Sequence, residues 1–466
     1  MTYTLTNDQI VLIQQAKDKV RAGCKSLLIQ GATGSGKTVI ASEIISGAYR
    51  KDKICFFIVP RRDLLRQTSA TLKEFGIPHS FIAAGMRCDT RAKIFVCSTM
   101  TVKNKLAIVP DVAIIDEGHV GGAGMDKIIA RYKAAGTVII MLSATPWKLS
   151  GRGLGCWVDD MVCGPSIRWL IDNKRLSEYR AFAPSTPDLS GIRTTAGDYN
   201  NKQLSERMED NRVLVGNAAK HYQDHAMGKL NIAYCVSRKH SEIVAQSFRD
   251  AGIPAQHMDG ETPDEERVRI VKAYARRELL VLTNCDLLTY GFDLSSASGM
   301  AVTVESMSDL RPTKSLALQL QKWGRVLRYK PYPALIFDHS NNFMEHGLPD
   351  AEREWTLADR EKSSRGESEK TIPVRQCLPD GDRPGCFFCH PPAPVCPNCG
   401  VPYPVQSREI EEVDGELAEI QIQQEKREKR QAQGKARTLE ELIAIGTAKG
   451  YKNPSFWARK VLSGRK

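Results

Sequence analysis

The sequence predicts an α/β protein in which parallel sheets carry the functional groups, and two patterns support this fold class. Short apolar runs of about four to eight residues alternate with longer segments whose apolar residues recur every three or four positions, which are the patterns of buried strands and amphipathic helices. Polar residues follow the apolar runs directly, where a parallel sheet places its binding site. With 466 residues and 42% hydrophobic content, the chain can form about three domains with cores of their own.

The first elements are a helix, a strand and a second helix. A helix is expected from Ile10 to Val20, with N-cap residues among the polar residues before it. Residues 26–30 (SLLIQ) form an apolar run typical of a buried strand, and residues 38–49 have helical spacing. The loop GATGSGKT lies between them, so the local order is strand, glycine-rich turn and helix.

That order predicts a phosphate-binding loop, made of Gly31, Ala32, Thr33, Gly34, Ser35, Gly36, Lys37 and Thr38. The turn directs backbone N–H groups and the positive end of the helix at one anion. Lys37 is expected to reach the β- and γ-phosphates of a nucleotide, and Thr38 to bind Mg²⁺. An ordinary glycine-rich turn is the alternative.

Four more apolar runs follow at residues 53–60, 93–99, 112–119 and 137–146, each ending in polar residues. The basic sequence RRDLLRQT, which begins at Arg61, opens a helix after the first of them. Asp116 and Glu117 come directly after the third run, which places Asp116 near the Mg²⁺ and leaves Glu117 to deprotonate a water. Hydrolysis of a γ-phosphate is the reaction that this arrangement predicts.

The second half of the chain repeats the pattern. Residues 151–229 are rich in turn residues and are expected to be a connector with some local structure. Strands are expected at 231–237 and within 278–294, and a helix with a basic end at 315–328.

The motifs GATGSGKT, VPRRDLLRQT, STMT, DEGH and SATP, in this order and spacing, resemble motifs I, Ia, Ib, II and III of superfamily 2 helicases of the DExH type. Segments 278–294 and 315–328 resemble motifs V and VI, and the GRVLR form is similar to the phage and repair branch that includes XPB-like and UvsW-like enzymes. The resemblance implies two RecA-like lobes, at residues 1–180 and 181–345, that close on ATP and Mg²⁺ and move a nucleic-acid strand.

The resemblance also implies roles for individual residues. Gln9 resembles the adenine-reading glutamine of the superfamily, although a plain surface glutamine is the alternative. Gln321, Arg325 and Arg328 match the motif that reaches the γ-phosphate from the second lobe, and Lys322 stands where many relatives have Arg. The other implied residues contact the nucleotide (Gly291 and Asp293), couple its hydrolysis to movement (His119, Ser143 and Thr145) or hold the nucleic-acid backbone (Arg61, Thr99 and Thr283).

A metal-binding module is expected after a charged linker at residues 346–376. Cys386, Cys389, Cys396 and Cys399 form two Cys-x-x-Cys pairs, which supply the four thiolates of a structural Zn²⁺ site. His390 or Cys377 could replace one ligand, because the loop between the pairs is shorter than usual. Residues 377–405 would form this zinc knuckle. Phe387 and Phe388 could stack on bases, although a core role is the expected one in so small a module.

Residues 406–466 combine a charged helical run with a basic end. The last eighteen residues carry lysines, arginines and aromatic residues without an acid, so they form either a nucleic-acid-binding helical module or a helix packed on a lobe. The other cysteines, such as Cys55, Cys97 and Cys235, lie in apolar strands and are expected to be buried and reduced.

Composition agrees with a nucleic-acid partner, because the formal net charge is +12. The first nine residues lack an apolar signal core and no apolar run reaches the ~20 residues that span a bilayer, so a cytoplasmic protein without membrane contact is expected. A monomer is the default expectation. The motifs leave DNA and RNA open as substrates, with DNA favoured. They also leave open a nucleotide-gated clamp that remodels nucleic acid without separating strands.

Overall fold

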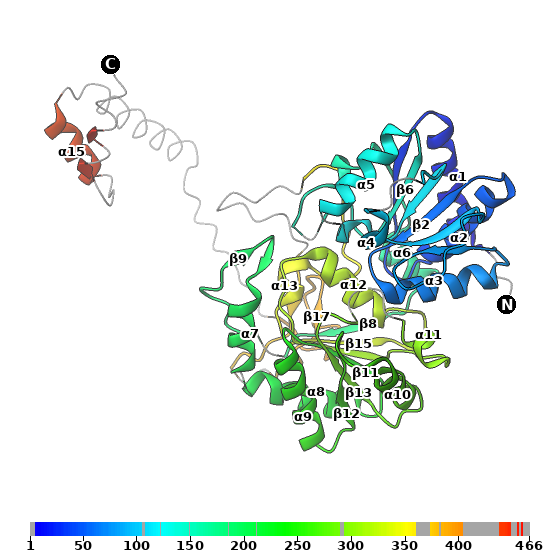
Figure 1. Cartoon of the computed structure of the whole chain (residues 1–466). Helices are drawn as coiled ribbons and strands as arrows, with labels where there is room; N and C mark the ends of the chain where they lie inside the picture. Colours follow the sequence, from blue (N-terminus) through cyan, green and yellow to red (C-terminus); the bar gives the residue numbers. More distant parts are fainter. Residues whose placement is uncertain are drawn as a thin grey trace. The chain divides into compact units, whose positions relative to one another are not determined.

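The computed structural model describes residues 5–104, 108–121, 123–148, 150–184, 186–210, 212–288, 293–359, 373–381, 384–403, 438–448, 454–455 and 458–459. The chain divides into two units, Met1–Tyr403 and Pro404–Lys466. The first unit contains two parallel α/β lobes, drawn in blue to cyan and in green to yellow (Figure 1).

The first lobe is built on a seven-stranded sheet in which every neighbouring pair is parallel. In spatial order its strands are β3 (Ser80–Ile82), β4 (Ile94–Ser98), β2 (Cys55–Val59), β5 (Val112–Ile115), β6 (Val138–Ser143), β1 (Ser26–Gln30) and β7 (Asp160–Cys163). The four runs that alternate least between apolar and polar residues, β1, β2, β4 and β6, are almost entirely buried, as strands covered on both faces must be.

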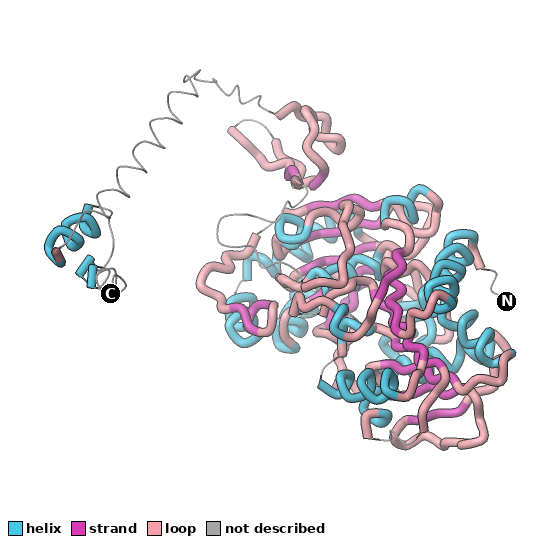
Figure 2. The backbone as a smooth tube through the Cα atoms, turned by 90° about the horizontal axis from the view of Figure 1, so that it is seen from above, coloured by secondary structure: helices cyan, strands magenta, loops and turns pink. Residues whose placement is uncertain are grey.

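Helices cover both faces of this sheet (Figure 2). On one face, α1 (Asn7–Arg21), α2 (Lys37–Arg50) and α3 (Arg62–Glu74) pack through Leu12, Ile40 and Leu65. On the other face lie α4 (Thr99–Val102) and α5 (Ala123–Ala134). Two short 3₁₀ helices, η1 (Gly118–Val120) and η2 (Leu154–Cys156), follow β5 and precede β7.

The second lobe has a six-stranded parallel sheet of its own. Its order is β12 (Ala255–His257), β13 (Val281–Asn284), β11 (Asn231–Tyr234), β14 (Ser306–Asp309), β15 (Ala334–Asp338) and β8 (Tyr179–Phe182). One face packs against α7 (Asn201–Glu209), α8 (Arg212–Ala226) and α9 (Arg238–Asp250). The other packs against α6 (Ile167–Asp172), α10 (Asp264–Ala275), α11 (Leu294–Ser298), α12 (Leu316–Val326) and α13 (Asn342–His346).

Residues 151–229, expected to be a connector with some local structure, contribute more to the fold than that expectation states. This stretch gives each sheet an edge strand, β7 to the first and β8 to the second, and also forms α6, α7, α8 and the small hairpin of β9 (Thr194–Thr195) and β10 (Asp198–Tyr199). Edge strands of four residues carry too short an apolar run to be recognised by periodicity. The chain passes from the first lobe to the second between these two strands.

The chain also returns to the first lobe after α13, through residues 347–359, which we call the return segment. The Trp147 indole Nε1 donates a hydrogen bond of 3.0 Å to the Ala358 carbonyl, and its ring lies 5.3 Å from that of Trp355. The Gly155 amide donates to the Leu357 carbonyl at 3.0 Å. A Cβ at Gly153 would lie 2.2 Å from the same carbonyl oxygen, so the segment fits only against glycine there.

A small module follows at residues 373–403. Its strands β16 (Arg375–Gln376) and β17 (Cys389–His390) are antiparallel. It covers the outer edge of β8, because the Ala183 amide donates to the Phe387 carbonyl at 2.9 Å and Phe182 forms an isolated antiparallel bridge with Phe388. An open sheet edge is thereby protected.

In the second unit, the structure describes one helix, α15 (Leu439–Ala448). The predicted charged helix and most of the predicted basic module, including the last residues of the chain, lie outside the described residues. Among the described helices, none combines the length and apolar character required to span a membrane.

Candidate functional site

The glycine-rich loop has the strand, turn and helix context that the sequence predicts. It connects β1 to α2, which begins at Lys37. Gly34 and Gly36 have φ values of 89° and 86°, which L side chains rarely adopt, so the turn requires glycine at both positions. The Lys37 ammonium donates hydrogen bonds to the carbonyls of Gly31 (3.0 Å) and Ala32 (3.3 Å), and Thr38 lies in the first turn of α2.

Gln9 lies against this loop. The residue is only 4% exposed, and its Nε2 donates to the Ser35 carbonyl at 3.2 Å. Gly36 has no room for a side chain here, since a Cβ would lie 2.5 Å from Gln9 Nε2. The alternative of a surface glutamine is therefore wrong.

Asp116 and Glu117 follow β5 at the same edge of the sheet. The Asp116 carboxylate accepts a hydrogen bond of 2.9 Å from the Glu117 amide. Burial, together with the neighbouring Glu117 charge, raises the pKa of Asp116 to about 7, while Lys37 opposes the shift. Glu117 has a left-handed backbone, with φ 50°, which is uncommon for a residue with a side chain.

A hydrogen-bond network joins the two lobes at this point. Gln321 of α12 donates from Nε2 to Glu117 (3.1 Å) and approaches His119 Nε2 at 3.0 Å. His119 Nδ1 lies 2.9 Å from the Ser143 hydroxyl, which also accepts the Thr145 amide at 3.2 Å. Burial lowers the pKa of His119, so the ring is neutral. A proton on Nδ1 then lets Nε2 accept from Gln321.

The lobes also touch directly through the loop. A Cβ at Gly324 of α12 would lie 2.2 Å from the Thr33 Cβ, and one at Gly34 would lie 3.0 Å from Leu176. The backbone of α12 therefore packs on the phosphate-binding loop without an intervening side chain at Gly324.

The two motif VI arginines differ in their surroundings. Arg325 is partly buried, and burial lowers the pKa of its guanidinium, as does the nearby Arg328. Arg328 pairs with Asp293 at 2.9 Å. Burial alone would raise the pKa of Asp293, but the Arg328 charge and the Ser296 amide outweigh it and hold the pKa below its usual value. Gly291 lies outside the described residues.

Of the three expected nucleic-acid contacts, one is wrong. Thr283 has no exposed surface, and its hydroxyl donates to the Ser241 carbonyl at 2.8 Å, so it cannot touch a strand. Thr283 lies within β13, and Ser241 of α9 contacts its hydroxyl on the face of the sheet. Arg61 is the N-cap residue of α3 and is partly exposed. Thr99 opens α4, and its hydroxyl donates to the Val59 carbonyl at 3.1 Å.

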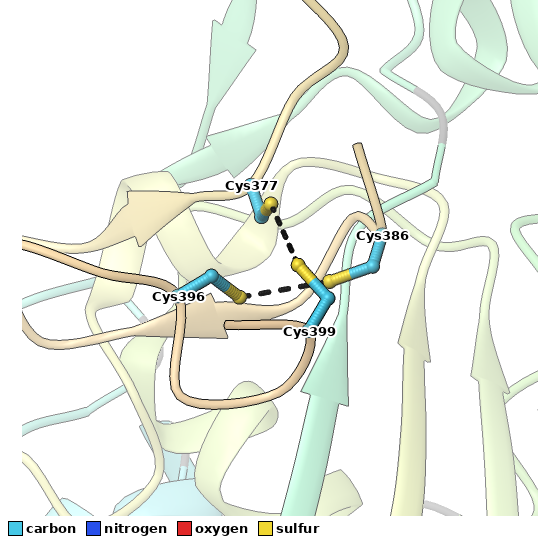
Figure 3. A group of neighbouring side chains, drawn as sticks. All are labelled: Cys377, Cys386, Cys396 and Cys399. Carbon is cyan, nitrogen blue, oxygen red and sulfur yellow. Dashed lines mark hydrogen bonds between the residues drawn. The ribbon is translucent and has the colours of Figure 1, made fainter. Parts of the chain in front are cut away.

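Four cysteines of the small module converge, but one differs from the predicted set. The thiols of Cys377, Cys386, Cys396 and Cys399 lie within 4.8 Å of one another (Figure 3). The Cys377–Cys399 and Cys386–Cys396 sulfur distances are 3.7 Å and 3.6 Å. A tetrahedral zinc with Zn–S bonds of about 2.3 Å needs sulfur separations of about 3.8 Å, so the cluster fits a zinc ion.

The prediction that Cys389 is a ligand is wrong, and the alternative Cys377 takes its place. Cys389 is 2% exposed, packs in the core of the second lobe, and is not among the four thiols that lie within 4.8 Å of one another. His390 is engaged elsewhere, with its Nε2 2.7 Å from the Tyr403 hydroxyl. Cys377 has no second cysteine at the Cys-x-x-Cys spacing. Local spacing therefore suggests it only as an alternative ligand.

Sequence reasoning also undervalued Lys322. It is fully buried, and its ammonium contacts the Asp309 carboxylate at 2.7 Å and 2.8 Å. The same carboxylate accepts from Gln319 (2.9 Å) and Asn342 (3.0 Å). This network fixes α12 to the end of β14, next to Gln321. The sequence shows a lysine in a helix that is rich in leucine, but this gives no sign that the lysine is buried.

The comparisons with known proteins divide the chain in the same way. The family model described as "Type III restriction enzyme, res subunit" matches residues 2–148, and "Helicase conserved C-terminal domain" matches residues 214–330. A 51.5 kDa protein of a Lactococcus phage (isolate 7-9) is 30% identical over 412 residues, which cover 86% of this chain and 85% of the phage protein.

A Saccharomyces cerevisiae protein assigned as the ATP-dependent helicase IRC3 is 29% identical over 68% of this chain, which spans 48% of the yeast protein. Among solved structures, a fragment assigned to the HsdR subunit of a type I restriction enzyme from Vibrio vulnificus has a TM-score of 0.56 at 18% identity, covering 73% of this chain and 65% of that one. The restriction-modification enzyme LlaBIII bound to DNA has a TM-score of 0.53 at 15% identity, covering 73% and 28%. Both show the two-lobed RecA-like fold.

Proposed function

Because the chain belongs to the superfamily 2 helicases, which hydrolyse ATP, we propose that it moves along DNA and separates or remodels its strands in replication, recombination or repair. We assign the phage and repair branch that includes XPB-like and UvsW-like enzymes. The bounds expected from the sequence are lobes at residues 1–180 and 181–345, a linker at 346–376, a zinc module at 377–405 and a C-terminal module at 406–466. Because α6 and β8 pack in the second lobe and β16 begins at Arg375, we propose that the second lobe begins near residue 164 and the module near residue 373.

One observation supports the coupled reaction most directly. The Gln321 amide of the second lobe reaches both Glu117 and His119 of the first. The Gln321 carbonyl oxygen is buried and has no hydrogen-bond partner in the described part of the chain, so it can accept from the attacking water. A residue that joins the base to the opposite lobe makes hydrolysis depend on the contact between lobes.

The roles of the remaining residues follow from position. The loop amides and Lys37 bind the phosphates, while Thr38 and Asp116 hold Mg²⁺. Glu117 takes the proton of the water, which is worth about 10²- to 10⁴-fold in rate. Arg325 and Arg328 neutralise the charge that develops on the γ-phosphate. We assign Gln9 to the adenine base and Asp293 to the nucleotide or its coupling to nucleic acid, and we assign Ser143 and Thr145 to the coupling between the site and the rest of the lobe.

One observation favours DNA as the substrate, and another favours nucleic acid of either kind. The family model that matches the first lobe describes a restriction enzyme subunit, and restriction enzymes act on DNA. The net charge of +12 suits a polyanion without separating DNA from RNA. The contacts expected from Arg61 and Thr99 reach phosphates, and binding should therefore depend on salt more than on sequence.

The test is the steady-state ATPase rate of the full chain with single-stranded, duplex and forked DNA and with RNA of matched length. We expect DNA to raise kcat, most with the forked form, and Lys37→Ala to abolish the activity because the phosphates lose their charge partner. Thermal unfolding of Lys37→Ala should match that of the original protein.

Each outcome has a distinct meaning. Stimulation by RNA alone would replace the DNA assignment with an RNA helicase. Stimulation without strand separation of a labelled fork would support the clamp or remodelling alternative. A rate that no nucleic acid changes would overturn the proposal.

A further inference from the structure

A cleft separate from the ATP site lies where the four-cysteine module meets the second lobe. It has a volume of about 420 Å³, within the range of small-molecule sites. Its walls come from β8, from α8 and from the module itself, and they include Arg180, Lys220, His225, Phe387 and Asn398. None of the residues assigned to ATP or to catalysis lines it.

The two adjacent phenylalanines of the module have different surroundings. Phe388 packs inward, with its ring 5.4 Å from Phe182 and 6.0 Å from His390. Phe387 lines the cleft and has a φ of 58°, a conformation that is strained for an aromatic residue. Its amide donates to the Cys377 carbonyl at 2.8 Å, and its carbonyl accepts from the Ala183 amide at 2.9 Å. These two backbone hydrogen bonds keep Phe387 in its strained conformation. Strained conformations of this kind concentrate at ligand sites.

Cations flank the aromatic wall. The Arg180 guanidinium lies 5.5 Å from the centre of the Phe182 ring and donates to the Asn398 side chain. Asn398 in turn donates to the Cys386 thiol at 3.2 Å, so the proposed metal cluster fixes the position of Arg180. Lys220 of α8 is exposed at the rim, and Asp224 is the acid that also lines the cleft.

We propose that this cleft binds one base of a single nucleic-acid strand by stacking on Phe387, with the adjoining phosphates paired to Arg180 and Lys220. An aromatic platform beside cations is the combination that holds single strands regardless of sequence. The inference rests on the proposed function, since it assigns a second contact to the same strand. It places that contact on β8 and α8, apart from the residues at the carboxyl ends of the strands.

The decisive variant is Phe387→Gly, because glycine adopts the left-handed backbone without strain while the ring is removed. We expect it to weaken binding of fluorescein-labelled oligothymidylate by on the order of 5- to 150-fold, the value of one base stack. An oligonucleotide containing 2-aminopurine should be quenched by the original protein and by Phe387→Tyr, but less by Phe387→Gly. ATP hydrolysis without nucleic acid should be unchanged in all three.

A second variant tests the cations. Arg180→Gln combined with Lys220→Gln should flatten the plot of log affinity against log salt by about 0.7 for each phosphate that is no longer neutralised, or about 1.4 in total. Lys202→Gln, an exposed lysine on α7 away from the cleft, serves as the matched control and should leave the slope unchanged. Repeating the titration with oligouridylate shows whether DNA or RNA is the preferred strand.

The outcomes separate this inference from the proposed function. If nucleic acid stimulates the ATPase but Phe387→Gly binds and quenches like the original protein, the cleft assignment is wrong and the motor assignment stands. If the cleft variants fail to bind an acidic peptide but bind oligonucleotides normally, the occupant is a protein and the cleft assignment is wrong. If the original protein binds no oligonucleotide, both assignments fail.

Discussion

Glu117 is a residue whose backbone stores strain at the site of chemistry. Its φ of 50° is held by η1, which starts at the next residue, and by the Gln321 hydrogen bond at 3.1 Å. A relaxed backbone would turn the carboxylate away from Gln321. The cost of such a conformation, about 1–3 kcal/mol, is offset by the packing around it.

His240 provides a pH test at the same scale. It is fully buried in α9, its Nδ1 accepts from the Val236 amide at 3.3 Å, and burial lowers its pKa to about 4. In the unfolded chain the ring takes up a proton near pH 6.5, so its contribution to stability is complete above that pH and is lost as the pH falls toward 4. We expect a loss on the order of 2 kcal/mol between pH 7 and pH 5.

The check is denaturant unfolding of the original protein and His240→Asn at both pH values. Asparagine keeps an acceptor for the Val236 amide but does not titrate, so the variant should lose less stability on acidification. An equal loss in both proteins would mean that other groups carry the acid sensitivity.

The sequence alone predicted most residues of the candidate site, because these residues lie in short continuous motifs. Lys37, Thr38, Asp116 and Glu117 lie in unbroken motifs whose strand and turn context fixes their position. Thr283 was misjudged because its motif lies partly inside a strand, and burial of a strand residue depends on neighbours that are distant in sequence.

At the scale of elements, α12 shows how a buried charge supports a site. The Lys322–Asp309 pair ties this helix to β14, so the orientation of Gln321 depends on a residue that never meets the nucleotide. Removing one partner of such a pair leaves an uncompensated charge in the interior. A lysine in place of the common arginine is therefore part of how this lobe is assembled.

The different positions of Cys377 and Cys389 in the small module predict different zinc contents for their variants. Cys377→Ala should lose zinc because one of four ligands is removed, whereas Cys389→Ala should retain about one zinc per chain because Cys389 packs against the second lobe. Metal content after dialysis against a weak chelator, measured by elemental mass spectrometry, distinguishes the two.

The unfolding temperatures of the two variants provide a second measurement. Cys377→Ala should unfold earlier than Cys389→Ala, since metal binding stabilises only the folded module. Zinc retained by Cys377→Ala and lost by Cys389→Ala would restore the ligand set that the spacing suggested.

Two of the strands that the sequence did not predict, β7 and β8, are alike in length and position. β7 and β8 are four residues long and lie at sheet edges, so each has an apolar run too short to stand out from a loop. The central strands β1, β2 and β6 were predicted because burial on both faces demands a continuous apolar run. The sequence offered Cys377 only as an alternative ligand, because its exchange with Cys389 depends on which face of β17 meets β8.

At the scale of the molecule, the return segment is a second physical link between the lobes. Trp355→Ala should release it from Trp147 and expose the Gly153 and Gly155 amides, which donate to Asp359 (2.8 Å) and to Leu357 (3.0 Å). We expect amide hydrogen exchange in residues 150–156 to accelerate about tenfold, which corresponds to roughly 1.4 kcal/mol of local stability.

Trp169→Ala is the matched control, because Trp169 lies on α6 and is 40% exposed. It should leave exchange in residues 150–156 unchanged. Equal exchange in the original protein and Trp355→Ala would show that the return segment is held by contacts other than the tryptophan pair.

The return segment also limits how the lobes can move. Within the described residues the chain passes between them at 164–178 and again at 347–359, so the lobes are tethered to each other at two places. Two connections leave the lobes less freedom to move relative to each other than one would. Any movement that separates Gln321 from Glu117 must therefore be accommodated by both connections at once.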